Sequence, residues 1–256
     1  MRGELVLSVS TLLGFLLTLV RVGGVFVFVP LPGITSVLSP VRVVLSLGIT
    51  IALFNEWPKI QAAPSAGLLL LWIMVEAALG IGIGLTVAFI GESFAIGAQM
   101  MGLQAGYGFA TTIDPNTQAD STVLVIFAQL AAGLLFFATG IDREVLRAFA
   151  RSLETWPAGT FVLTRGVAQQ VLFAGSAMFS TGLRLALPMI AIMVMIDISL
   201  ALLGRVNAQL QLITIAFPVK MMVALTMLGW LAILLPTLFR AGMDTSFGVI
   251  RGLIAR

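Results

Sequence analysis

The sequence predicts an all-α membrane protein with about six long, kinked apolar helices. Of its 256 residues, 59% are hydrophobic and only 10% are charged, and the mean hydropathy is +1.11. A typical globular domain has roughly 25% charged residues, so this chain has too few charges to cover a soluble core. Its apolar excess needs lipid, partner subunits or both around it. We expect one continuous membrane domain over residues 1–256.

Composition also excludes several classes of function. The chain has no cysteine and no histidine, which removes disulfides, thiolate metal sites, imidazole bases and the common zinc motifs. The net charge is only +3, and the lysines and arginines are spread along the chain. A nucleic-acid surface would need a basic stripe interleaved with aromatic residues. We therefore expect no catalytic site, no metal, no cofactor and no nucleic acid.

Six apolar segments are the candidate helices, since a membrane crossing takes about 20 apolar residues. In chain order they are residues 5–29, 41–54, 65–90, 122–141, 170–203 and 209–239. The second is short for a crossing, and the fifth is too long for one straight crossing. Pro188 and Pro218 lie inside the last two segments, where a proline kinks or breaks a helix. Irregular lengths with internal prolines favour helices packed on other protein.

A long, weakly polar stretch separates the third and fourth segments. Residues 91–103 are a candidate helix rich in glycine and methionine, and residues 104–121 contain the only tyrosine and an Asp-Pro-Asn turn. Loops of this length are often functional lids or plugs, and an ordinary external loop is the alternative. The candidate residues here are Met100, Met101, Gly106, Tyr107, Gly108, Phe109, Asp114 and Pro115. Methionine fills irregular gaps, and composition alone favours a core role for the two methionines over a seal.

A second polar stretch covers residues 142–165. Arg143, Arg147 and Arg151 recur at every fourth residue, which places them along one stripe of a helix. This pattern predicts an amphipathic segment at a membrane or partner surface. A solvated face beside the lipid headgroups is the alternative.

Five ionisable residues lie inside the apolar segments: Arg21, Glu76, Arg184, Asp197 and Lys220. A charge at the bilayer centre costs about 2.5–3.5 kcal/mol on insertion scales, so such residues normally pair or face a polar cavity. A proton or ion path is one interpretation. We favour pairing that fixes assembly with neighbouring subunits, because a relay usually clusters several carboxylates on one helix.

Glycines follow one of these charges at helical spacing. Gly80 and Gly84 come one and two turns after Glu76, and they form a small-xxx-small face that lets another helix approach closely. The same spacing also occurs by chance in glycine-rich membrane helices.

Several of these stretches together resemble the FliR/SctT family, the R-type subunit of flagellar and type III secretion export gates. The matching pieces are Arg21 with Pro30 and residues 39–42, Glu76 with Gly80 and Gly84, residues 91–103 with Asp114 and Pro115, Ser152 with Pro157, and residues 205–210 with 217–220. The chain departs from the family pattern at Ala208, where proline is common. The Phe-Pro-x-Lys form of the last piece looks more flagellar than virulence-type.

The resemblance implies a non-catalytic gate subunit in the bacterial inner membrane, at the base of the flagellar basal body. It implies hairpins of kinked helices packed into a multi-subunit helical ring with P-type and Q-type subunits, with the B-type subunit and the export apparatus as further partners. Unfolded proteins would cross through the channel. The loop at residues 107–121 would plug the pore, and the neighbouring methionines would help to seal it.

Three alternatives to this expectation are open. A virulence-type secretion gate subunit would share the architecture. A secondary transporter or channel would use Glu76, Asp197 or Lys220 for coupling, but the paired repeats typical of transporters are not recognisable in the sequence. A membrane-embedded enzyme would need a nucleophile with a base, or paired carboxylates, and the loop residues Asp114 and Asp120 lack the Gly-x-Gly-Asp context of an aspartyl protease.

Overall fold

The computed structural model describes residues 8–32, 39–58, 60, 64–106, 123–157, 159–162, 164–206 and 212–254. These residues form seven α-helices and one short 3-10 helix, and they include no strand. The helices are α1 (Val9–Phe28), α2 (Pro40–Ala52), α3 (Ala66–Ala105), α5 (Val123–Ala138), α6 (Ile141–Thr155), α7 (Arg165–Val206) and α8 (Leu212–Ile254), and the 3-10 helix η1 is Phe54–Glu56. The predicted all-α fold is therefore confirmed.

Local sequence signals set several of the helix ends. Ser8, Ser39 and Ser65 are the N-cap residues of α1, α2 and α3, and each side chain accepts a hydrogen bond from a backbone N–H of the first turn. Gly106 ends α3 with a φ of +87°, a left-handed conformation that glycine adopts without strain. The point at which the chain leaves α3 is therefore defined by the sequence itself.

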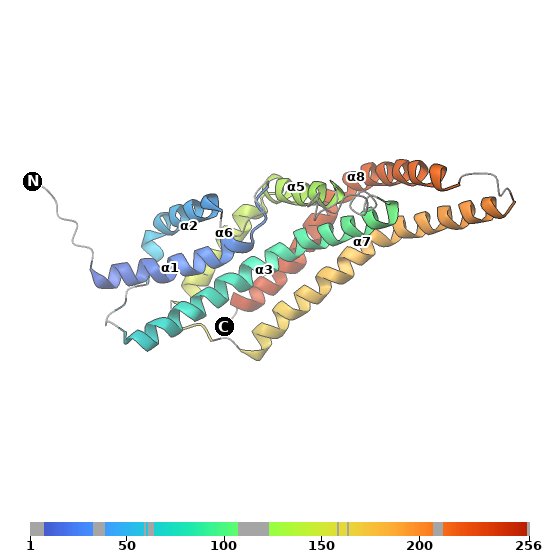
Figure 1. Cartoon of the computed structure of the whole chain (residues 1–256). Coiled ribbons are helices and arrows are strands. Elements are labelled where there is room, and N and C mark those ends of the chain that lie inside the picture. Colours follow the sequence, from blue (N-terminus) through green and yellow to red (C-terminus); the bar gives the residue numbers. More distant parts are fainter. Residues whose placement is uncertain are drawn as a thin grey trace, which may run out of the picture.

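Helix α3 is the central element of an elongated molecule. It packs against α1, α5, α7 and α8, and Figure 1 shows α3, α7 and the C-terminal half of α8 running along one another. At one end of the molecule, the last turns of α7 and the first turns of α8 extend beyond the other helices (Figure 1).

The long helices are more continuous than the sequence suggests. Residues 65–90 and 91–103, predicted as separate segments, form the single 40-residue helix α3. Pro188 stays inside α7, and Pro218 and Pro236 stay inside α8. The prolines bend these helices without ending them, and both change direction along their length in Figure 1.

The number of helices able to cross a membrane is lower than the number of apolar segments. Among the described residues, α1, α3, α7 and α8 are long and apolar enough to cross, and α5 with α6 would make a fifth span bent by 69°. Helix α2 has 13 residues, which is too short for a crossing. Gly140, with a φ of +74°, lies at the bend between α5 and α6.

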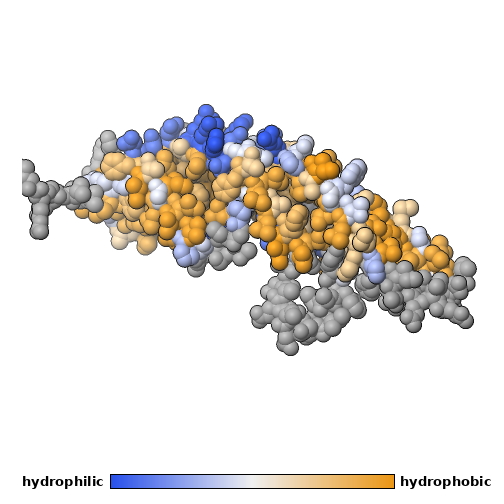
Figure 2. Space-filling view, turned by 90° about the horizontal axis from the view of Figure 1, so that it is seen from above, coloured by the Kyte–Doolittle hydropathy of each residue, from blue (hydrophilic) through white to orange (hydrophobic). Residues whose placement is uncertain are grey.

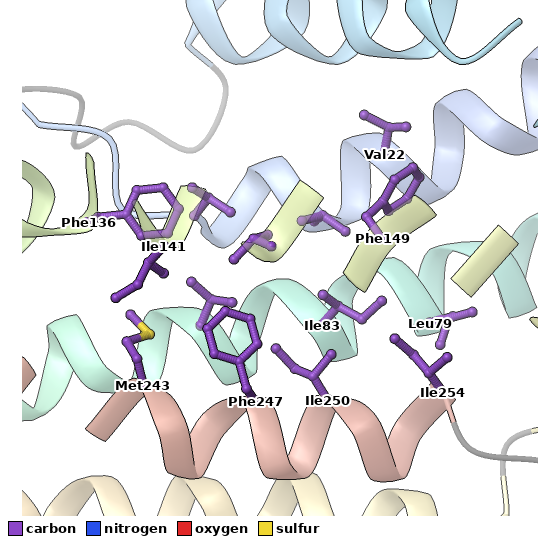
Figure 3. Close-up of a cluster of buried hydrophobic side chains, with 14 of the residues drawn as sticks. Val22, Leu79, Ile83, Phe136, Ile141, Phe149, Met243, Phe247, Ile250 and Ile254 are labelled. Carbon is purple, nitrogen blue, oxygen red and sulfur yellow. The ribbon is translucent and has the colours of Figure 1, made fainter. Parts of the chain in front are cut away.

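The main hydrophobic core lies where α1, α3, α6 and α8 meet. Figure 3 shows Phe247, Ile250 and Ile254 of α8 pointing toward Ile83 and Leu79 of α3. A second, smaller cluster near the far end of α3 is rich in methionine and alanine. Its buried members are Met101, Ala105, Ala186, Met189, Met193 and Ala224.

Candidate functional site

The most distinctive polar group in the molecule is a buried ion pair between α1 and α3. Arg21 Nε donates to Glu76 Oε2, and both side chains have 0% exposure. The two other guanidinium nitrogens each donate to a backbone carbonyl at 2.8 Å, one of Ser152 and one of Trp156. The second carboxylate oxygen, Glu76 Oε1, accepts from the backbone N–H of Gly159 at 2.8 Å. The pair therefore ties α1 and α3 to the end of α6 and the loop that follows it.

Glycines allow α1 and α3 to come close enough for this pair. A Cβ atom at Gly80 would lie 2.2 Å from the carbonyl oxygen of Arg21, and one at Gly84 would lie 2.5 Å from that of Val25. Neither backbone atom can move aside as a flexible side chain would. The close-approach face predicted from Gly80 and Gly84 is thus filled by α1 of the same chain.

The loop after α6 connects this polar group to the end of α8. Trp156 Nε1 donates to the carbonyl of Ile254, the last residue of α8, at 3.0 Å. The ring of Phe161 stacks edge-on against Trp156, with 5.6 Å between the ring centroids. Gly159 has a φ of +81°, and a Cβ atom there would lie 2.7 Å from the ring of Trp72. These contacts join α1, α3, the loop after α6 and the end of α8, and they fix the positions of these four elements relative to one another.

A second arginine caps the end of α1, which sequence reasoning did not predict. Arg42 of α2 is buried, and its Nη1 donates to the carbonyls of Phe26, Val27 and Val29. The last carbonyls of a helix have no intrahelical partner, so the guanidinium satisfies groups that would otherwise be unpaired. The available sequence signal was a lone arginine in a mostly apolar helix, two residues after the Ser-Pro start of that helix.

The other predicted charges lie on the long hairpin of α7 and α8. Asp197 and Lys220 form an ion pair between the two helices, with the lysine mostly buried and the carboxylate 44% exposed. Arg184 is exposed on α7, and within the described part of the chain no ion pair is formed by it. Four of the five predicted charges are therefore paired inside the chain.

The two predicted pore methionines lie in the smaller cluster beside α7 and α8. Met101 is 4% exposed and packs with Met189 and Met193, and Met100 is half-buried against the same group. Gly106 follows directly, where α3 ends. The remaining predicted plug residues, Tyr107, Gly108, Phe109, Asp114 and Pro115, lie outside the described residues.

Large apolar side chains remain exposed over much of the surface. On α7 and α8 they include Leu172, Phe173, Met195, Trp230 and Ile233, each more than two-thirds exposed. Figure 2 shows the hydrophilic residues gathered along one edge, with apolar residues over most of the rest of that face. Apolar patches of this extent indicate contact with lipid or other subunits.

The arrangement offers no recognisable catalytic chemistry among the described residues. Its buried carboxylate is neutralised by an arginine, and the described residues include no group of three acidic side chains able to hold a metal ion. The buried polar contacts are of the kind that fix helices relative to one another.

Comparison with known proteins gives a consistent set of relatives. The chain matches the model of the bacterial export proteins, family 1, over residues 12–246. It is 29% identical to the flagellar biosynthetic protein FliR of Escherichia coli (strain K12), over 82% of this chain and 81% of that protein. It is 28% identical to FliR of Pectobacterium carotovorum subsp. carotovorum over 76% of each chain, and 24% identical to FliR of Bacillus subtilis (strain 168) over 84% of each.

Proposed function

This chain belongs to family 1 of the bacterial export proteins and is a polytopic inner-membrane component of the flagellar export apparatus, and we propose that it forms part of the channel for unfolded export substrates. The observation that carries this proposal is the apolar surface of α7 and α8, which the chain leaves uncovered. A channel wall built from several subunits would bury such surfaces between neighbours.

The proposed neighbours are the P-type and Q-type gate subunits, with the B-type subunit and the rest of the export apparatus beyond them. Arg184 supports this arrangement, because an exposed arginine on an apolar helix needs a polar or acidic partner once the helix is covered. We assign the assembly role to Arg184 and to the pair of Asp197 and Lys220, whose carboxylate is partly exposed. Arg21 and Glu76 serve assembly indirectly, by fixing the shape of the subunit.

The second part of the proposal is a plug formed by the loop after Gly106. The C-terminal end of helix α3, from which this loop starts, lies beside the methionine cluster and the α7–α8 hairpin. Small and apolar side chains would exclude ions at rest, in the way that hydrophobic constrictions close by dewetting. No catalytic step enters this mechanism. Opening requires only that an entering polypeptide displaces the loop.

The test is a deletion within residues 107–121, made in a strain that carries the assembled gate. We expect increased ion leakage across the inner membrane, measured with a potential-sensitive dye. A variant of unchanged length, with the same residues replaced by glycine and serine, separates loss of side chains from loss of loop length. Unchanged leakage in the deletion strain, with the gate still assembled, would contradict the plug.

A further inference from the structure

A groove between α6 and the end of α8 is not used by the proposed channel mechanism. It has a volume of about 740 Å³, within the range of about 300–1,000 Å³ typical of small-molecule sites. Its charged lining consists of Arg147, Arg151, Glu144 and Glu154 of α6 and Arg251 of α8. We infer that this groove, the α6–α8 groove, binds the headgroup of an anionic phospholipid.

The charges of the groove suit a phosphate at its centre. Arg147 and Arg151 are one helical turn apart, or about 6 Å along the axis, and Arg251 lies across from them on α8. All three arginines are exposed, and none forms an ion pair with another described residue. Guanidinium groups bind phosphate with paired hydrogen bonds, so three around one space make an anion site.

Two glutamates limit which anions the groove accepts. Glu144 and Glu154 lie ten residues apart on α6, about 15 Å along its axis, on either side of the two α6 arginines. Three arginines and two glutamates leave a balance of one positive charge, which suits a single phosphodiester. The hydroxyls of a glycerol headgroup can donate to the flanking carboxylates, whereas a more highly charged anion would be repelled by them.

The floor of the groove favours lipid over a soluble anion. Its apolar lining includes Phe247, Ile250 and Ile254 of α8, which are at most 7% exposed, and Figure 3 shows all three among the side chains of the main core. In a phospholipid the apolar acyl chains lie next to the charged phosphate, and the groove likewise has apolar residues next to basic ones. Basic pockets between membrane helices bind anionic headgroups in this manner.

The position of the groove along the membrane spans supports the same ligand. Arg251 lies in the last turn of α8, at the end of a candidate span. Helix α6 follows directly after α5, whose exposed residues include Ile126, Leu130 and Leu134, and turns away from it by 69°. Both walls thus carry arginines close to an apolar helix segment, an arrangement common near the boundary between hydrocarbon and headgroups.

The test measures lipid binding to the full chain, purified in detergent together with its co-expressed partner subunits. Native mass spectrometry would follow the binding of added phosphatidylglycerol and, in parallel, phosphatidylcholine. We expect selective retention of phosphatidylglycerol. Removing the three groove arginines in Arg147→Ala/Arg151→Ala/Arg251→Ala should weaken that binding by about fivefold for each arginine, or about a hundredfold in total.

The matched control removes the same number of exposed arginines outside the groove, in Arg143→Ala/Arg165→Ala/Arg240→Ala, and should bind phosphatidylglycerol like the unmodified chain. Co-purification of the partner subunits with each variant shows that the assembly is intact, independently of lipid. The inference is overturned by equal retention of both lipids or by equal losses in the two triple variants. It is also overturned if an acidic peptide such as polyglutamate displaces the lipid at equal concentration, which would assign the groove to a protein partner.

Discussion

Arg21 of α1 and Glu76 of α3 form an ion pair in which neither side chain has any exposed surface, although 55 residues separate them in the chain. Every nitrogen of the guanidinium and both carboxylate oxygens have a hydrogen-bond partner. Such a pair costs desolvation energy that good geometry only offsets, but breaking it leaves an uncompensated buried charge. The main consequence of this ion pair is that it holds α1, α3 and the loop after α6 in a fixed arrangement.

Replacing one partner of this pair should strongly destabilise the subunit. Glu76→Gln leaves Arg21 charged and buried, and we expect a loss of about 3–5 kcal/mol in the free energy of unfolding. Thermal unfolding of the purified complex, followed by tryptophan fluorescence, measures the loss. Glu92→Gln, the same substitution at an exposed position of α3, should stay within about 0.5 kcal/mol. Equal stability of the two variants would show that the pair is not needed for folding.

The glycine face between α1 and α3 gives a second prediction with a control only two residues away. Gly80→Ala places a methyl group 2.2 Å from a backbone oxygen of α1, so the helices must separate and the Arg21 pair must open. At Gly82 the nearest atom is a side-chain carbon at 3.9 Å, and alanine favours a helix over glycine by about 1 kcal/mol. We expect Gly80→Ala to lower the melting temperature and Gly82→Ala to maintain or raise it. The opposite order would mean that the helices are not in contact at this face.

Local sequence patterns predict each of these features, but they do not predict which residues of distant segments contact each other. The long apolar segments predicted the helices, and the spacing of Gly80 and Gly84 predicted the close approach of another helix. Charges in apolar segments predicted pairing that fixes assembly with neighbouring subunits, without naming the paired residues. The structure joins Arg21 to Glu76 and Asp197 to Lys220 within the chain. Partner choice depends on contacts between distant segments, which no local pattern records.

Local sequence patterns also did not predict that the long helices are continuous. Residues 91–103 were expected to form a separate helix rich in glycine and methionine, but in the structure they continue α3, and Gly97 lies against a neighbouring helix. At Gly97 a Cβ atom would lie 3.3 Å from the carbonyl of Gly182 on α7. Around Pro188, α7 is held against α3 by contacts at Gly182 on one side and Met189 on the other. Tertiary packing compensates for the proline's missing hydrogen bond.

The capping role of Arg42 gives a third prediction, which concerns one end of α1. Arg42→Gln removes the guanidinium from the carbonyls of Phe26, Val27 and Val29. Loss of a partner for a buried carbonyl such as that of Val29 costs about 1–3 kcal/mol, and the last turn of α1 should fray. Hydrogen exchange at the amides of residues 25–29 should therefore be faster. Arg143→Gln, at an exposed position of α6, should leave that exchange unchanged, and unchanged exchange in Arg42→Gln would exclude the cap.

The last prediction separates packing from sealing at Met101. This side chain is 4% exposed within the single chain and contacts the methionines of α7, so Met101→Ala should leave a cavity and destabilise the subunit by about 2–5 kcal/mol. Met101→Leu conserves volume and should cost less than about 1.5 kcal/mol. Met74→Ala, at a residue 70% exposed on the same helix, controls for loss of a methionine. Thermal stability of the purified complex and ion leakage in cells would be measured for all three variants. Leakage from Met101→Leu at unchanged stability would assign the side chain to the seal; leakage only where stability falls would assign it to packing beneath the gate.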